Sequence, residues 1–330
     1  MTESISSAIA RETGLSTKHV EATLALLADG ATIPFISRYR KEATGGLDEV
    51  AIFNISKRAD ELGELAKRKS YILTTIDGQG NLTDELRQRI NECTDINVLE
   101  DIYLPFKPKR RTRAQMAREK GLEPLAKTIM AQNLSAPSEA ARRFLSDKVA
   151  TVDEALQGAS DIIAEWVNEH EEVRSRVRDQ FHRFATISSK VVKGKEDEGE
   201  NYANWFDFSQ SLNRCGSHAY LALRRGEREG ILRVGIDVDD QRTLARLLPL
   251  FVKRHAAPEV AEFITQAVAD GYKRLTRPAI ENEIAAEAKT KADSAAINTF
   301  AENLRQLLLS APLGSKRILG VDPGFRTGCK

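Results

Sequence analysis

Apolar residues recur with helical spacing along most of the chain, at positions three or four apart. This spacing predicts a long helix over residues 49–77, which Asp48 can cap at its N-terminus. It predicts a second long helix over 278–309, about 45–50 Å from end to end at ~1.5 Å per residue. The pattern as a whole predicts a mainly α fold.

Two short segments, 187–192 and 231–236, favour strands because they are rich in β-branched residues or alternate between apolar and polar positions. We expect them to pair as a small antiparallel element. A third apolar run, 318–321, leads into Asp322-Pro-Gly, a sequence that fits a tight turn. The predicted organisation has four parts: a helical N-terminal region (1–185), a small mixed region (186–276), a long central helix (277–311) and a final strand (317–330).

Composition narrows the class of protein. Hydrophobic residues make up 41% of the chain and aromatic residues only 6%, which favours helix over sheet. Three widely spaced cysteines form no CxxC pair, so we expect a reduced, cytoplasmic setting. The N-terminus does not have the pattern of a signal peptide, and no apolar run approaches the ~18 residues of a membrane span. The five histidines lack metal-ligand spacing, so we expect no metal and no other cofactor.

Positive charge is concentrated in one short stretch. Residues 107–120 contain seven Lys or Arg and one acid, Glu119, a local net charge of +6, whereas the whole chain carries +1. Such a concentration suits a polyanion, and nucleic acid is the commonest polyanionic partner. We call the cations at its start the basic segment: Lys107, Lys109, Arg110, Arg111 and Arg113.

The basic segment is predicted to contact the phosphate backbone of RNA or DNA without reading sequence. The alternative is a solvated loop that docks on acidic helices of the same chain. Two aromatic residues just before it, Tyr103 and Phe106, could stack on bases, but the prolines and apolar residues beside them favour burial. Pro105 and Pro108 predict an extended start to the segment, with helix resuming near Gly121.

A second basic cluster, Arg38, Arg40 and Lys41, follows Pro34 in a short predicted helix. It could also contact nucleic acid, or Arg38 could pair with Glu42 and fix helix packing as an elbow. Three further arginines at 174, 176 and 178 alternate, so they cannot all share one helical face, and we expect a solvated helix there. No phosphate-binding loop, nucleophile elbow or paired His/Cys arrangement occurs.

Five segments resemble, in the same order, motifs of the bacterial Tex family of transcription accessory factors: 29–49, 103–113, 202–209, 217–230 and 320–328. The resemblance implies a cytoplasmic nucleic-acid-binding protein linked to transcription. It also implies an N-terminal helical region with a helix-turn-helix, a long central helix, and then a YqgF (RNase H-like) domain. Helix-hairpin-helix units and an OB-fold RNA-binding domain would follow beyond this sequence.

In the RNase H-like fold that the resemblance implies, Asp322 corresponds to the first metal-binding carboxylate. Two-metal chemistry needs further carboxylates from other strands, and the sequence ends eight residues later. We therefore expect no catalytic residues here, with Asp322 as a vestigial carboxylate at most. Two alternatives stay open: a scaffold that binds transcription machinery without touching nucleic acid, and part of a metal-dependent nuclease that begins at Asp322.

Overall fold

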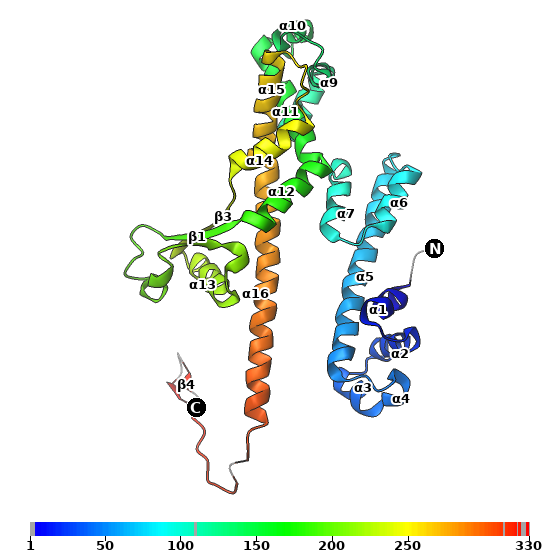
Figure 1. Ribbon diagram of the computed structural model, residues 1–330, viewed down its shortest axis with the longest axis vertical. Helices are drawn as coiled ribbons and strands as arrows, with labels where there is room; N and C mark the ends of the chain where they lie inside the picture. Colours follow the sequence, from blue (N-terminus) through cyan, green and yellow to red (C-terminus); the bar gives the residue numbers. More distant parts are fainter. Residues whose placement is uncertain (1–3, 109–110, 313, 322, 325–327, 330) are drawn as a thin grey trace. The chain divides into compact units, whose positions relative to one another are not determined.

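The computed structural model describes residues 4–108, 111–312, 314–321, 323–324 and 328–329 (Figure 1). Most of these residues are helical, which confirms the mainly α prediction. The chain forms two compact units. Unit 1 contains residues up to Arg174 together with Lys253–Gly271, and unit 2 contains Ser175–Val252 and the residues from Tyr272 onward.

Unit 1 is built from helices whose starts follow local sequence signals. Asp48 accepts a hydrogen bond from the Ala51 N–H at 2.8 Å, and Thr83 and Thr151 cap their helices in the same way. Its helices are α1 Ile5–Thr13, α2 Thr17–Ala28, α3 Ile33–Tyr39, α4 Lys41–Thr44, α5 Glu49–Gly78, α6 Asp84–Glu92, α7 Ile96–Tyr103, α8 Arg113–Glu119, α9 Glu123–Ala131, α10 Pro137–Ala141, α11 Val152–Glu169 and α15 Pro258–Gly271.

The apolar stripes of unit 1 meet in separate clusters. One cluster joins α1, α2 and α5 around Ile9, Val20 and Ile55. Another joins α5, α6 and α7 around fully buried isoleucines and Tyr103. The long helix α5 therefore contributes to both clusters, one near each of its ends, which is why its apolar stripe runs along most of its length.

Helix α15 returns to unit 1 after a long excursion of the chain and packs on α11. The two backbones approach closely at Gly271, where an added Cβ would lie 2.7 Å from the carbonyl oxygen of Ala164. The boundaries predicted at 185 and 276 follow changes in the local sequence pattern, and they differ from the boundaries of the two compact units. Packing of α15 on α11 links residues that are far apart in the sequence.

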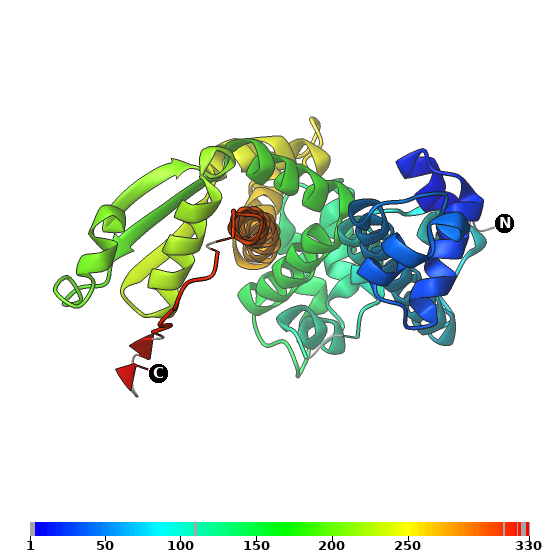
Figure 2. The same ribbon diagram turned by 90° about the horizontal axis from the view of Figure 1, so that it is seen from below.

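Unit 2 contains a three-stranded antiparallel sheet in the order β2-β1-β3 (Figure 2). The two predicted strands do pair, with Ile187 opposite Ile236. The third strand, β2, was not predicted, because its sequence Asp-Phe-Ser-Gln-Ser is mostly polar. The strands and covering helix are β1 Thr186–Val191, β2 Asp207–Ser211, β3 Leu232–Asp237 and α13 Ser217–Arg228.

Three more helices organise unit 2: α12 Glu171–Phe184, which begins in unit 1, α14 Asp240–Leu247 and α16 Arg277–Leu308. Helix α16 confirms the predicted long helix and is preceded by a π-helical turn, Tyr272–Thr276. Its apolar side chains change from buried to exposed along the helix: Ile280 is fully buried, whereas Phe300 is 68% exposed.

The run 318–321 is not a strand, contrary to the prediction, and its described apolar side chains are exposed. A strand needs a neighbour that pairs with its backbone N–H and C=O groups, and within the described residues none pairs with this run. The strands found there are the two-residue β4, Pro323–Gly324, and β5, Gly328–Cys329. Asp322 lies outside the described residues, and the helix-turn-helix stays a prediction.

None of the helices formed by the residues that the structure describes is both long enough and apolar enough to cross a membrane.

Candidate nucleic-acid interface

The chain entering the basic segment is fixed by an aromatic anchor. Tyr103, at the end of α7, is 1% exposed and lies edge-on to Tyr71, with 6.4 Å between ring centroids. Burial raises the pKa of the Tyr103 phenol above its usual range. Phe106 packs against the same cluster, and its carbonyl accepts a hydrogen bond from Gln79 at 2.9 Å. Burial of Tyr103 is confirmed and Phe106 is partly buried, so the Tyr103 ring presents no face for stacking on bases.

The chain leaving the basic segment is fixed by a helix cap. The Thr112 hydroxyl accepts from the Gln115 N–H at 3.0 Å and donates to the Glu165 carboxylate at 3.0 Å. Helix α8 therefore begins at Arg113, well before the predicted resumption near Gly121. Pro108 restricts only the residues directly around it, and a threonine four positions later is sufficient to start a new helix.

The described cations of the basic segment face solvent. The side chain of Lys107 is 51% exposed, with its Nζ 3.8 Å from Glu100. The side chain of Arg111 is 71% exposed, and its guanidinium lies 2.8 Å from Glu119. Arg113 is exposed on the first turn of α8 and makes no ion pair within the described residues. Lys109 and Arg110 lie outside the described residues.

The acids beside Lys107 and Arg111 give some support to the alternative in which the segment docks on its own chain. Both pairs are exposed, however, and exposed ion pairs contribute only ~0–1 kcal/mol. A phosphate can therefore replace either carboxylate at little cost. The arrangement is a short basic stretch held at both ends, with its charges in solvent.

The second basic cluster lies at the elbow between α3 and α4. The expected pair between Arg38 and Glu42 is wrong: Arg38 lies 3.7 Å from Glu49 on α5. The cause is Arg40, whose φ of −127° interrupts the helix, so residues 38 and 42 are not on one continuous helix. The Arg40 guanidinium lies over the Phe35 ring at 5.1 Å, and Lys41 is exposed. Contacts to α5 and to an aromatic ring agree with an elbow that fixes helix packing.

Gly45 closes this elbow with a left-handed conformation, φ 69°, at the end of α4. An added Cβ there would lie 2.3 Å from the imidazole of His19 on α2. The close approach of α4 to α2 thus requires glycine. Arg38, Arg40 and Lys41 are on the same short stretch, but the structure does not bring them together with the basic segment.

The arginines at 174 and 178 are not on a solvated helix face, contrary to expectation. Arg174 forms a buried ion pair with Asp101, and Arg178 forms one with Glu283. Their spacing of four residues puts both on one face of α12, a signal that the alternating pattern obscured. Arg176 points elsewhere and donates to the backbone carbonyl of Arg246 at 2.7 Å.

Within the described part of the chain, no group of three or more His, Cys, Asp or Glu side chains is arranged to hold a metal ion. The described members of the basic segment offer guanidinium and ammonium groups only. These groups donate hydrogen bonds and attract anions, but at ordinary pH they neither accept a proton nor ligate a cation. The chemistry available at the segment is electrostatic binding.

Two family descriptions match the sequence: "Tex-like protein N-terminal domain" over residues 3–77 and "Tex central region-like" over residues 132–300. Protein tex of Bordetella pertussis is 41% identical over 337 residues, which cover 98% of this chain and 42% of that protein. Transcriptional accessory protein Tex of Neisseria gonorrhoeae is 37% identical, covering 98% of this chain and 43% of that protein.

A human protein, S1 RNA-binding domain-containing protein 1, is 28% identical over 326 residues and is matched over 32% of its length. The chain thus spans less than half the length of the relatives that it matches.

Proposed function

The chain belongs to the Tex family of transcription accessory proteins, and on this premise we propose that it binds the phosphate backbone of nucleic acid through its basic segment, without reading base sequence. The observation that carries the proposal is the anchored, exposed basic segment. The buried Tyr103 precedes the segment and the capping Thr112 lies just before its last cation, Arg113; the described cations of the segment are exposed.

The binding is electrostatic. A bound backbone loses condensed counterions as Lys and Arg neutralise its phosphates, and the released ions drive association. The acids near Lys107 and Arg111 compete weakly with phosphate because both pairs are exposed. The human relative is named for an S1 RNA-binding domain, which supports a nucleic acid as the partner.

The test is fluorescence anisotropy with labelled single- and double-stranded RNA and DNA, titrated over a salt series. A variant with Lys109, Arg110, Arg111 and Arg113 changed to Gln is compared with wild type. We expect log K to fall with log salt, and the variant to lose ~3 units of that slope, at ~0.7–0.9 per phosphate contact.

A control variant removes the same charge from exposed cations of unit 1 with no ion pair among the described residues: Lys57, Arg142, Arg143 and Lys148, each changed to Gln. Equal losses of slope in the two variants would mean that only overall charge matters, and the site assignment would fall. Absence of binding by the wild type at low salt would remove the proposed function altogether.

A second candidate is a protein-interaction scaffold that contacts transcription machinery. It is favoured by a row of exposed apolar side chains on the second half of α16: Ile297, Phe300, Leu304, Leu307 and Leu308. Rows of this kind mark protein contacts. Capture of RNA polymerase from nuclease-treated extract by wild type, lost when Phe300 and Leu307 are changed to Ser, would favour it over the basic segment.

We propose no catalytic step for this chain. We also propose that the protein acts in the cytoplasm. Any Mg²⁺-dependent cleavage of nucleic acid by this chain that disappeared in Asp322→Ala would contradict the first part and support the nuclease alternative.

A further inference from the structure

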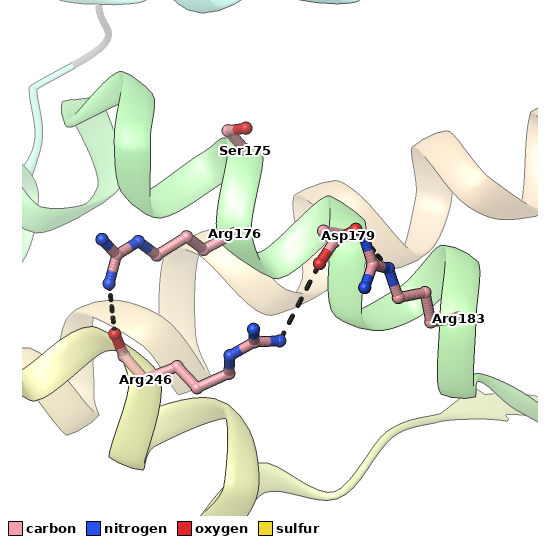
Figure 3. Close-up of a pocket in the computed structure, with 5 residues that line it drawn as sticks. All are labelled: Ser175, Arg176, Asp179, Arg183 and Arg246. Atoms are coloured by element: carbon pink, nitrogen blue, oxygen red, sulfur yellow. Dashed lines mark hydrogen bonds and ion pairs between the residues drawn. The ribbon is translucent and has the colours of Figure 1, made fainter.

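A cleft between α12 and α14 lies within unit 2 and has a volume of about 480 Å³, in the range of ligand sites. Figure 3 shows the Arg176 guanidinium on α12 at the backbone carbonyl of Arg246 on α14, while the Arg246 side chain extends toward Asp179, which also faces Arg183. Sites for drug-like ligands are mostly apolar, whereas every side chain that lines this cleft is polar. The lining residues are Ser175, Arg176, Asp179, Arg183 and Arg246.

Both walls of this arginine cleft are held in place by contacts within unit 2. Arg178 on α12 pairs with Glu283 on α16. At the start of α14, Asp240 accepts a hydrogen bond from the buried Tyr272 at 2.8 Å and one from Arg277 at 2.9 Å. Burial and the hydrogen bond to Asp240 raise the pKa of Tyr272 well above its ordinary value, so its hydroxyl remains a donor. The cleft is therefore formed before a ligand arrives.

The guanidinium groups in the cleft outnumber its carboxylates. Three arginines and one aspartate line it, a formal charge of +2. Asp179 accepts from the Nε of Arg183 at 2.7 Å, but the Arg246 guanidinium lies 3.8 Å from it, beyond hydrogen-bond distance. Arg246 thus keeps its five N–H donors without a hydrogen-bond acceptor among the described residues, in a fork that matches phosphate oxygens.

Positive charge extends past the cleft on α14. Arg242 is one turn before Arg246 on α14, and its guanidinium lies 3.9 Å from the centroid of the Phe184 ring at the end of α12. Arg176 and Arg183 are seven residues apart on α12, or ~10 Å along the helix axis. The length over which these arginines are spread exceeds the size of a single phosphate group. It fits a chain that carries phosphates at repeated intervals.

We propose that the arginine cleft is a second phosphate-backbone site for nucleic acid, in which Arg183 and Arg246 contact phosphates and Arg242 extends the track. This inference rests on the proposed function for its partner, nucleic acid, but the arginine cleft uses different residues from the basic segment. An experiment can therefore disprove one of the two sites and leave the other standing. A polymer fits better than a phosphorylated peptide, because the arginines continue beyond the cavity.

The test uses the whole 330-residue chain in the same salt-dependent anisotropy experiment, with the double variant Arg183→Gln/Arg246→Gln. The substitution at 246 keeps the backbone carbonyl that Arg176 bonds, so the cleft retains its shape. A matched double variant, Arg214→Gln/Arg233→Gln, removes two exposed charges elsewhere in unit 2 that have no ion pair among the described residues. Circular dichroism spectra of both variants are compared with wild type, to test that each variant folds.

We expect the cleft variant to lose ~1.4–1.8 units of slope, at ~0.7–0.9 per contact, and the matched variant to lose much less. Equal losses in both variants, or none in the cleft variant, would overturn the inference. If the basic-segment variant still loses slope of log K against log salt in that case, the proposed function remains supported without the second site. A phosphoserine peptide that binds wild type and is lost from the cleft variant, with no change in nucleic-acid slope, would overturn the assignment to nucleic acid.

Discussion

The basic segment and the arginine cleft gather positive charge by different routes. In the segment, five cations follow one another along seven residues, so a count of charges along the sequence finds them. In the cleft, the cations come from two helices that are separated in the chain by a sheet and a helix, so no one stretch of sequence contains all of them. Charge density along a sequence reveals the first kind of site, whereas the second kind appears only when helices pack.

The two regions are also held differently. The segment depends on an apolar anchor, Tyr103, and on one helix cap, Thr112. The cleft depends on ion pairs and polar contacts to α16 and to its preceding turn, such as Arg178 with Glu283. The first support removes apolar surface from water, whereas the second is a buried ion pair, which salt screens only weakly. Substitutions at the supports should therefore separate the two regions.

The largest expected effect is loss of the apolar anchor. Tyr103→Ala removes a ring that is 1% exposed from the α5–α7 cluster, and we expect a loss of ~3–5 kcal/mol in the free energy of unfolding of unit 1. The matched change is Tyr71→Ala, at a ring that is 54% exposed, which we expect to cost much less. Hydrogen exchange in α7 measures both, and equal effects would contradict the anchor.

The next effect concerns the ion pair that supports the cleft. Glu283→Ala removes the carboxylate that Arg178 faces, where both side chains are at least 85% buried, and we expect ~2–3 kcal/mol of destabilisation. Glu287→Ala, one turn along α16, removes an exposed partner of His182 and should cost under ~1 kcal/mol. Urea unfolding followed by hydrogen exchange in α12 distinguishes them. A larger effect at Glu287 would show that this account of the support is wrong.

The cap at the end of the basic segment gives a smaller effect. Thr112→Ala removes the acceptor for the Gln115 N–H and the donor to Glu165, and we expect ~1–2 kcal/mol of destabilisation. Thr112→Ser keeps the hydroxyl and should stay close to wild type. Thermal unfolding measures the difference. Equal stability of the Ala and Ser variants would show that the cap does not fix the segment.

The smallest expected effect on stability comes from the residues that we propose to contact phosphate. Arg111→Gln in the segment and Arg183→Gln in the cleft each break one exposed ion pair, and we expect under ~0.5 kcal/mol in either case. Both variants should nevertheless lose ~0.7–0.9 units of salt slope in nucleic-acid binding. A stability loss of several kcal/mol at either position would identify it as a structural support and remove it from the binding surface.

Local features of the fold were predictable from the sequence. Asp48 caps its helix where the pattern placed it, α16 follows its apolar stripe, and β1 pairs with β3. Each of these depends on a signal contained in one short stretch. The sequence pattern did not predict the polar strand β2, because this strand forms by pairing with β1 and not by burying an alternating apolar face.

Features that depend on how the helices pack were harder to predict from the sequence. The anchors of the basic segment were predictable in part, since prolines and apolar neighbours indicated burial of Tyr103 and Phe106. The acids near Lys107 and Arg111, and the pairing of Arg38 with Glu49, depend on how helices pack. The arginine cleft depends on packing entirely, because no single stretch of the sequence contains both of its walls.

The most direct test of the central claim combines the two sites in one set of salt titrations. Anisotropy with labelled nucleic acid is measured for wild type, the four-residue basic-segment variant, the Arg183→Gln/Arg246→Gln variant, and the two combined. We expect slope losses of ~3 and ~1.4–1.8 units, and a combined loss of ~4–5, because independent phosphate contacts add. A combined variant that keeps the wild-type slope would contradict the claim that these cations bind phosphate.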